Sequence, residues 1–344
     1  MSQYSKIVGT GSYLPTQRVT NEALVAQLAS SGVETSNDWI VERTGIHARH
    51  FAQAHEFSSD LAFHACVNAL QAAGLGPQDI DLIIVATSTP DMVFPSTACI
   101  LQHKLSKLND EASGIAGAPA FDVQAVCSGF IYALTVADAM IRAGNAKRAL
   151  VVGAEVFSRL LDFKDRTTCV LFGDGAGAVL LEPSTDENGI LDSILKTDGI
   201  GRNYLNMKAG GSLKPASVET VLAKEHFIFQ DGQPVFKFAV KGMADVSAEL
   251  LERNNLTGDD IAWLVPHQAN LRIIDATANR MGLSKDKVMI NIQRYGNTTA
   301  ATIPLCLWDW EKQLNKGDNI VLAAFGGGFT WGATWIKWAY DTTK

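Results

Sequence analysis

The chain has 344 residues, of which 47% are apolar and 19% charged, a composition typical of a soluble globular protein with room for two hydrophobic cores. Its formal net charge of −7 disfavours attraction to nucleic acid or to an anionic membrane, so we expect neither partner. No apolar run is long enough to span a bilayer, and the first residues lack the pattern of a signal peptide. The five cysteines include no CxxC pair, which favours reduced thiols and a cytoplasmic protein.

Strand and helix signals alternate along the chain, which predicts an α/β layered fold. "SSDLAFHACVNALQAAG" (58–74) has apolar residues at helical spacing and ends in glycine, so we expect a helix there. A second helix is expected to begin at Pro95. Residues 200–234 are the least patterned part of the chain and are interpreted as a covering insertion. Buried strands are predicted at "DLIIVATS" (81–88), "RALVVGAEV" (148–156) and "NIVLAAFGGG" (319–328).

The sequence repeats one pattern. "LGPQDIDLIIVA" (75–86) matches "LTGDDIAWLVPH" (256–267) at a constant offset. In each half an apolar strand, one special residue and a long helix follow: "FDVQAV" before Cys127, and "VMINIQ" before Asn297. We infer a duplication, with halves at 1–185 and 186–344 that meet near the turn-forming "EPSTDENG".

Three residues with reactive or hydrogen-bonding side chains can converge if the two halves pack together. His267 follows a predicted strand, at the edge where α/β proteins place their sites, and Cys127 and Asn297 are expected at equivalent helix starts. The helix dipole should lower the pKa of the Cys127 thiol from roughly 8.5 toward neutrality. His267 can move a proton or hydrogen-bond a substrate, and Asn297 is a neutral donor. The glycines of "FGGGFTWG" (325–332) allow the close backbone approach that an oxyanion hole requires.

Papain-like hydrolases also use Cys, His and Asn in this order, and the separation of Cys127 from His267 falls in their range. Against them, the segment "AVCSGF" lacks their cysteine signature, and the duplicated strand order does not suit their fold. "GDGAGA" (173–178) is followed by the strand-like "VLLE", so we interpret it as a close-packed turn and not as a nucleotide-binding loop.

The segments "DVQAVCSGF", "VPHQAN", "YGNTTAATIP" and "AFGGGFTWGA" resemble the signature segments of the β-ketoacyl-acyl carrier protein synthase III family. Recognisable segments extend from "GTGSYLP" (9–15) to the end of the chain. Thiolases would carry a second catalytic cysteine near the C-terminus, whereas the last cysteine here is Cys306. Elongating synthases pair the cysteine with two histidines, and plant-type polyketide synthases usually have a different glycine motif.

The resemblance implies a homodimeric thiolase fold, in which the duplicated halves form a five-layered α-β-α-β-α sandwich. It also implies an acyltransferase that joins a short acyl-CoA, foremost acetyl-CoA, to malonyl-acyl carrier protein and so initiates fatty-acid synthesis. Cys127 would carry the acyl group, the backbone N–H groups of Cys127 and Gly327 would bind the oxyanion, and His267 and Asn297 would bind the malonyl thioester. No metal or other cofactor is expected. A related condensing enzyme of specialised metabolism and, from another class, a thiol hydrolase stay open as alternatives.

The resemblance implies binding residues as well. The coenzyme A tunnel would be lined by Trp39, stacked on the adenine, together with Arg43, Arg166, Phe236, Asn270 and Arg272. The neighbours of His267, including Gln268, would line the same tunnel. Phe94 would cross the dimer interface and close the partner's acyl pocket. Acyl carrier protein is acidic, so its docking requires a local basic patch, for which the candidates are Lys237, Arg272 and Arg280.

Overall fold

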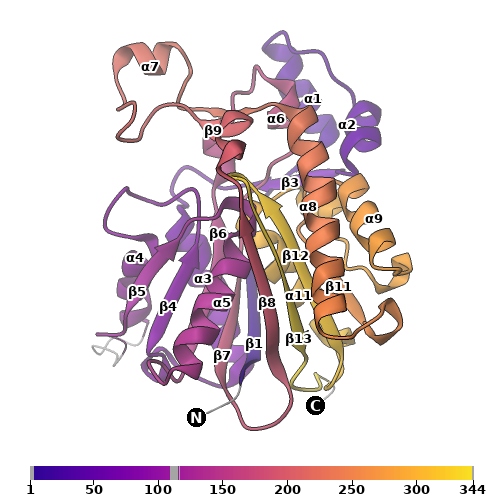
Figure 1. Ribbon diagram of the computed structural model, residues 1–344. Coiled ribbons are helices and arrows are strands. Elements are labelled where there is room, and N and C mark those ends of the chain that lie inside the picture. Colours follow the sequence, from indigo (N-terminus) through magenta and orange to yellow (C-terminus); the bar gives the residue numbers. More distant parts are fainter. Residues whose placement is uncertain (1–3, 109–114, 116, 343–344) are drawn as a thin grey trace.

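The computed structural model describes residues 4–108, 115 and 117–342, which form five stacked layers, two sheets and three layers of helices (Figure 1). The five-layered α-β-α-β-α thiolase fold predicted from the sequence is confirmed. One sheet has the order β1-β7-β6-β4-β5 and the other has the order β11-β12-β13-β8. The strands of the first sheet are β1 (Tyr4–Tyr13), β4 (Leu82–Ala86), β5 (Ala120–Val123), β6 (Ala149–Glu155) and β7 (Gly175–Ser184). Those of the second are β8 (Gly189–Thr197), β11 (Trp263–Pro266), β12 (Asn319–Gly326) and β13 (Thr330–Lys337).

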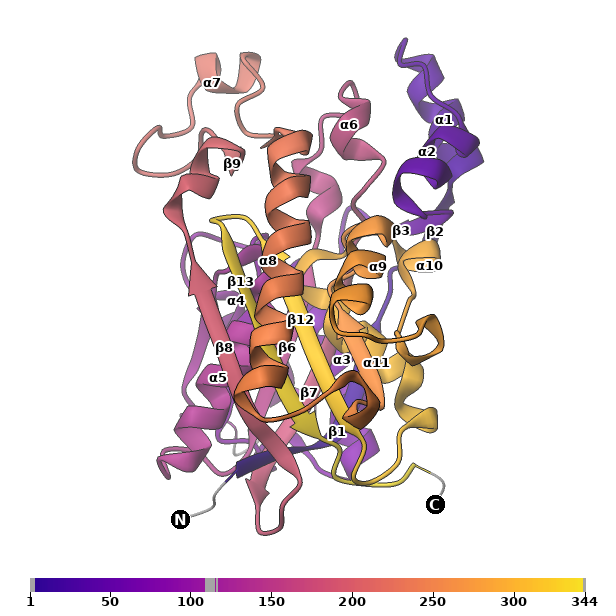
Figure 2. The same ribbon diagram turned by 45° about the vertical axis from the view of Figure 1, so that its right-hand side comes forward.

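Helices fill the three remaining layers. α3 (Ser58–Ala73) and α4 (Thr97–Ser106) cover the outer face of the first sheet. α5 (Gly129–Arg142) and α11 (Thr302–Trp310) lie between the two sheets. α8 (Gly232–Arg253) and α9 (Leu271–Arg280) cover the outer face of the second sheet, as Figure 2 shows. The central helices are therefore the most apolar, because both of their faces meet a sheet.

The two sheets repeat one strand pattern. From β1 through β7 and β6 to β4, the pairings run antiparallel, antiparallel and parallel, and the same sequence of pairings runs from β8 through β13 and β12 to β11. Short 3-10 turns precede β4 and β11 in the same way, and in each an aspartate, Asp79 or Asp260, accepts a hydrogen bond from the backbone N–H three residues earlier. The echo between 75–86 and 256–267 is thus an echo of local structure.

One predicted strand is wrong, and one predicted helix begins two residues later than expected. Residues 288–293 do not form a strand, because Val288 makes only an isolated parallel bridge to Leu264 and Ile292–Tyr295 turns into the short helix α10. This bridge occupies the place that β5 has beside β4 in the first sheet. The helix expected at Pro95 begins instead at Thr97, where the Ser96 hydroxyl accepts a hydrogen bond from the Cys99 N–H and caps the first turn.

The remaining elements surround one end of the second sheet. The segment 200–234 contains β9 (Leu205–Met207), the protruding α7 (Val218–Leu222) and β10 (Ile228–Gln230), and it lies over that end (Figures 1 and 2). Its interpretation as a covering insertion agrees with this position. A small unit comprises β2 (Gln17–Thr20), α1 (Asn21–Ser30), α2 (Asn37–Thr44) and β3 (Ala48–Phe51). In Figures 1 and 2, α6 (Arg166–Cys169) lies between this unit and the segment 200–234.

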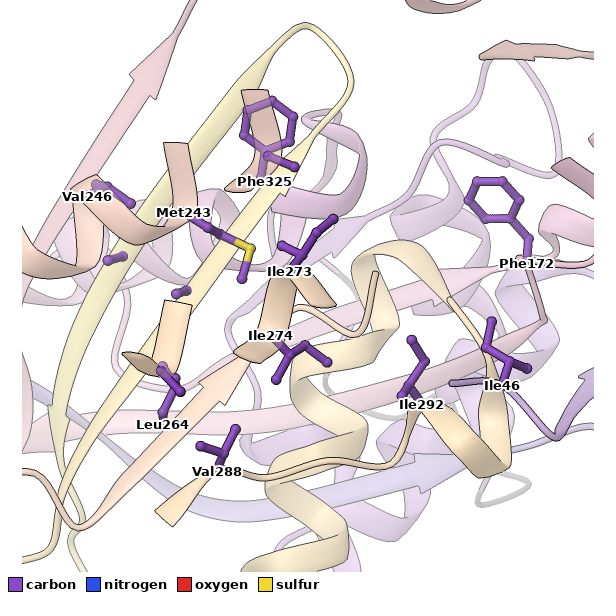
Figure 3. Packing of buried hydrophobic residues seen from close by; sticks show 14 of the residues in the cluster. Ile46, Phe172, Met243, Val246, Leu264, Ile273, Ile274, Val288, Ile292 and Phe325 are labelled. Atoms are coloured by element: carbon purple, nitrogen blue, oxygen red, sulfur yellow. The ribbon is translucent and has the colours of Figure 1, made fainter. Parts of the chain in front are cut away.

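The core behind this end is built by α8 and α9 against the second sheet (Figure 3). Met243 of α8 and Ile274 of α9 are fully buried and pack with Leu264 of β11. Burial of each such side chain stabilises the fold by roughly 1.5–3 kcal/mol. Phe325, at the end of β12, belongs to the same cluster and lies where the core meets the candidate site. The site is therefore backed by rigid packing.

Candidate active site

One cavity of about 740 Å³ opens between the two halves of the chain. Its lining includes Cys127 from the first half and His267 and Asn297 from the second. The structure therefore brings together the three residues that the sequence singled out, although 140 residues separate the first two along the chain. The other walls come from α2, α8, the β10 segment and the start of α9.

Cys127 lies in a single 3-10 turn, Val126–Ser128, between β5 and α5. Val126 has a φ of 46°, and this left-handed kink directs the chain into α5. Gly326 packs so closely on the turn that a Cβ there would lie 2.7 Å from the Cys127 nitrogen. The second half has the same kink at Thr299, with a φ of 51°, but Asn297 precedes this kink while Cys127 follows its own. Both residues therefore lie just before a central helix, as expected, but at different positions relative to the kink.

The pKa of the Cys127 thiol, which was expected to be lowered, is instead raised in this structure. The side chain is 7% exposed, and its burial raises the pKa of the thiol, with a further increase from the Glu155 carboxylate. Burial disfavours the charged thiolate more than the start of α5 favours it. The surroundings of Cys127 in this structure therefore favour the thiol over the thiolate.

His267 is held from both sides. Its backbone N–H donates to the Ala323 carbonyl over 2.7 Å, which extends the β11–β12 pairing by one residue. Its ring Nδ1 lies 2.7 Å from the Thr302 hydroxyl. Burial lowers the pKa of His267 to about 3, so the ring is neutral near pH 7. The Thr302 hydroxyl has one hydrogen and two acceptors within reach, His267 Nδ1 and the Thr299 carbonyl at 3.0 Å. When it donates to Nδ1, the hydrogen of the neutral ring is on Nε2.

Asn297 is oriented by its own turn. The Thr299 backbone N–H donates to Asn297 Oδ1 over 2.8 Å. Within the described residues the Asn297 amide nitrogen has no hydrogen-bond acceptor, so it can donate to a ligand in the cavity. The backbone of Asn297 is in turn fixed by the first half, because its N–H donates to the Leu171 carbonyl and its carbonyl accepts from the Gly173 N–H. The position of this amide thus depends on contact between the two halves.

Gln268 does not line the cavity, contrary to expectation. It is fully buried, and its amide donates to the carbonyls of Pro266 and Met289. Its oxygen accepts from the backbone N–H groups of Asn291 and Ile292. Gln268 therefore fastens the end of β11 to the segment that leads to α10, which is a structural role.

The predicted coenzyme A residues gather at the mouth of the cavity. The guanidinium groups of Arg43 and Arg166 both stack on the Trp39 ring, 4.8 Å and 4.9 Å from its centroid. Arg272 stacks in the same way on Phe236, at 4.8 Å. All of these except Arg166 line the cavity, and Arg166 donates to the Glu34 carbonyl beside it. The mouth is therefore aromatic and basic, as recognition of a nucleotide phosphate requires.

Asn270 also lines the cavity, but its side chain already has partners. Its amide nitrogen donates to the Arg43 carbonyl over 2.7 Å, and its oxygen accepts from the Arg272 N–H as the cap of α9. Asn270 thus ties the end of α2 to the start of α9 and sets the spacing of the two cavity walls.

Four further predicted residues lie outside the cavity of their own chain: Phe94, Gly327, Lys237 and Arg280. Phe94 is 81% exposed and belongs to an exposed apolar run with Met92 and Val93. Gly326 lines the cavity, whereas its neighbour Gly327, the predicted oxyanion donor, does not. Among the basic candidates, Lys237 and Arg272 are exposed. Arg280 is 3.8 Å from Asp245, and this carboxylate offsets the positive charge of Arg280 at the surface.

Sequence reasoning missed two residues beside the catalytic candidates. Thr302 contacts His267, and Glu155 acts on Cys127 from the end of β6. Neither carries a motif of its own, because a threonine in a helix and a glutamate after an apolar strand are ordinary. Among the described residues, no group of three or more His, Cys, Asp or Glu could hold a metal ion, and no helix is long and apolar enough to cross a membrane.

Comparisons with known proteins agree with the geometry. The family model for 3-oxoacyl-[acyl-carrier-protein] synthase III matches residues 121–199, and the model for the C-terminal part of that family matches residues 251–338. A β-ketoacyl-[acyl-carrier-protein] synthase III of Bacteroides thetaiotaomicron is 50% identical over 98% of this chain and 97% of its own length. The chain belongs to the 3-oxoacyl-acyl carrier protein synthase III family.

Solved structures place the chain in the same family. The 3-oxoacyl-acyl carrier protein synthase III of Aquifex aeolicus superposes with a TM-score of 0.85 at 42% identity, over 97% of this chain and all of that one. The priming β-ketosynthase of the R1128 polyketide pathway gives a TM-score of 0.87 at 30% identity, over 99% of this chain and 98% of that one. The family fold is thus shared by fatty-acid and polyketide enzymes.

Proposed function

We propose that this synthase joins a short acyl-CoA, foremost acetyl-CoA, to malonyl-acyl carrier protein, with release of CO₂, and so initiates fatty-acid synthesis. Membership of the synthase III family supports the reaction class. The single observation that carries the residue roles is the convergence of Cys127, a neutral His267 and Asn297 in one cavity with an aromatic and basic mouth.

In the first half-reaction, the Cys127 sulfur attacks the thioester carbonyl of the acyl-CoA. The bond from that carbonyl to the coenzyme A sulfur breaks, and the proton of the Cys127 thiol ends on the released coenzyme A. The oxyanion formed on the way accepts hydrogen bonds from the backbone N–H groups of Cys127 and Gly327, the glycine next to Gly326 of the cavity wall.

In the second half-reaction, His267 Nε2 and the Asn297 amide donate to the thioester carbonyl of the malonyl group. Loss of CO₂ leaves an electron pair that these donors stabilise as an enolate. The enolate carbon then attacks the acyl group on Cys127, and the thiolate leaves and regains a proton. Because the ring of His267 is neutral, it contributes a hydrogen bond and no charge. The reaction needs no metal or other cofactor.

The acyl-CoA and the carrier protein bind at the mouth of the cavity. Trp39 stacks on the adenine, with Arg43 and Arg166 close by, while Phe236, Asn270 and Arg272 shape the tunnel. The acidic carrier protein docks on the basic side of this mouth, at Lys237, Arg272 and Arg280.

The enzyme acts as a homodimer. The apolar run Met92–Phe94, with exposed fractions of 56%, 89% and 81%, is covered by a second copy, and Phe94 closes the acyl pocket of that copy. Each chain consists of two thiolase-like halves, 1–185 with the nucleophile and 186–344 with His267, Asn297 and the glycine loop.

The test is incubation with isotopically labelled acetyl-CoA, followed by intact mass and by addition of malonyl-acyl carrier protein. A gain of one acetyl group, lost in Cys127→Ser, and conversion to 3-oxoacyl product are expected. A thiol hydrolase would release acetate without the malonyl substrate, and a non-catalytic acyl-binding protein would gain no covalent mass. Labelling on another cysteine, such as the exposed Cys99, would refute the assignment of the nucleophile.

A further inference from the structure

Glu155, the last residue of β6, is a completely buried acid that the reaction above does not use. Its carboxylate accepts hydrogen bonds from the Thr89 hydroxyl at 2.6 Å, the Thr87 hydroxyl at 3.3 Å and the Ser88 backbone N–H at 3.1 Å. All of these donors are neutral, and no ion pair of Glu155 with a basic side chain is present in the described part of the chain. A buried carboxylate without a cation is expensive to ionise.

The turn that carries Cys127 lies directly against the elements that hold Glu155. A Cβ on Gly129 would be 3.2 Å from Ala86, the residue before Thr87, and 3.6 Å from Ala300. Ala300 in turn abuts β6, because a Cβ on Gly153 would be 2.2 Å from the Ala300 carbonyl oxygen. The thiol turn, the end of β4 and the end of β6 therefore form one rigid cluster. Through it the Glu155 charge raises the pKa of the Cys127 thiol.

Burial also affects the Glu155 carboxyl itself. Burial, which outweighs its hydrogen bonds, raises the pKa of Glu155 to about 7. If Glu155 is ionised, a thiolate on Cys127 is a second negative charge in the same buried cluster. If Glu155 holds a proton, a thiolate on Cys127 has no negative charge on Glu155 to oppose it. The two groups therefore titrate as a coupled pair.

We propose that Glu155 is a positioning residue whose buried carboxylate, held in the cluster that carries the Cys127 turn, opposes ionisation of the Cys127 thiol. The ionised carboxylate keeps the resting nucleophile as a thiol, and a proton on Glu155 releases this restraint. The inference rests on the proposed role of Cys127, but it concerns the thiol alone and needs no acyl substrate.

Other charged groups near these elements have partners of their own. Asp174, next to the residue that pairs with Glu155, accepts from the backbone N–H groups of Ala52 and Ser158. Asp60 of α3 binds Lys104, and Asp91 binds the hydroxyl of Ser59. The groups that meet Glu155 from the second half belong to the Thr299–Ala301 turn and are uncharged. His267 stays neutral because of burial. Farther along the central helices, Asp138 binds Arg142 and Asp309 binds Arg294.

The experiment measures the rate at which iodoacetamide alkylates Cys127, from pH 5 to pH 10, by mass spectrometry of the peptide that contains it. In Glu155→Gln, which removes the charge and keeps the shape, the midpoint should fall by about one to two pH units. At a pH below the midpoints of both proteins, the lower midpoint of Glu155→Gln gives it the larger thiolate fraction. A less basic thiolate is also a weaker nucleophile, which offsets about half of this gain on a logarithmic scale. At pH 9, where the wild-type Glu155 is ionised, alkylation of Glu155→Gln should therefore be roughly 3- to 10-fold faster, and near pH 7, where Glu155 is about half protonated, the gain should shrink to about twofold.

Asp174→Asn is the matched control, because Asp174 is equally buried and hydrogen-bonded but does not act on Cys127. Its profile should match that of the wild type. Unchanged or slower alkylation in Glu155→Gln would overturn the proposal, since a slower rate would mean that Glu155 accepts the thiol proton. The wild type alone gives a second test that does not depend on a variant folding: its profile should rise in two steps, and a single ionisation would also overturn the proposal. Normal acylation by acetyl-CoA in the same samples shows that such a failure leaves the proposed function intact.

Discussion

Thr302→Val tests how His267 is held. The substitution keeps the shape of the side chain and removes the hydroxyl that lies 2.7 Å from His267 Nδ1. The ring is 1% exposed, so water does not replace the lost partner. The Thr299 carbonyl, which also accepts from the Thr302 hydroxyl, keeps the hydrogen bond from the Thr302 backbone N–H. Removal of the hydroxyl therefore affects mainly the His267 imidazole, whose Nδ1 loses its hydrogen-bond partner and whose ring gains rotational freedom.

An unpaired buried polar atom costs about 1–3 kcal/mol. If that free energy is lost from the orientation of His267 toward the malonyl carbonyl, condensation should slow by roughly 5- to 150-fold. The effect should fall on kcat, with little change in the KM for acetyl-CoA, because Thr302 does not line the cavity. Thr302→Ser keeps the hydroxyl and should restore most of the rate.

The assay separates the two half-reactions. Acyl-enzyme formation is followed by intact mass after rapid quench, and decarboxylation by release of labelled CO₂ from malonyl-acyl carrier protein. Decarboxylation should fall in Thr302→Val while acylation stays within a fewfold of the wild type. A variant that decarboxylates at the wild-type rate, or one whose two half-reactions fall equally, would refute the reasoning. Thermal unfolding of the three proteins checks that the comparison concerns the same fold.

Four further outcomes are expected. Asn297→Ala should still form the acyl-enzyme but condense on the order of 10²–10³-fold more slowly, as when one oxyanion donor is removed; failure to acylate would give Asn297 an earlier role. Arg272→Glu should raise the KM for malonyl-acyl carrier protein and flatten its dependence on salt, and an unchanged salt response would move the docking face elsewhere. The wild type should prefer acetyl-CoA to octanoyl-CoA. Phe94→Ala should shift kcat/KM toward longer acyl groups by about tenfold for two extra methylenes, at roughly 0.8 kcal/mol each. Parallel chain-length profiles of the two proteins would contradict the role of Phe94 in closing the acyl pocket. The melting temperature of Glu155→Gln should rise relative to that of the wild type as the pH rises from 5 to 8. The folded-state pKa of Glu155 is about 7, against 4.5 for the free side chain, so ionisation destabilises the wild type by up to about 3 kcal/mol above pH 7. A difference in melting temperature that stays constant over this range would show that Glu155 ionises as a free side chain does.

The duplicated architecture was predictable from the sequence because its signals are local. Helix 58–73 carries its own periodicity and a terminal Gly74 in the left-handed region, and β4, β6 and β12 are runs of apolar residues with nothing to compete with the strand conformation. The strand predicted at 288–293 failed because a strand needs a partner along its length. Only Val288 finds one in Leu264, and the chain then turns into α10.

The chemistry of the site divides in the same way. The sequence by itself determined which residue types are available, and Cys127, His267 and Asn297 could be named because their motifs are specific. Only the tertiary structure decided their state, because the free energy of a charge depends on what surrounds it. Burial and Glu155 oppose the effect of a helix start on Cys127, and burial keeps His267 neutral. Residues that act through such surroundings, Glu155 and Thr302, carry no signature along the chain, since their importance arises from contacts between segments that lie far apart in the sequence.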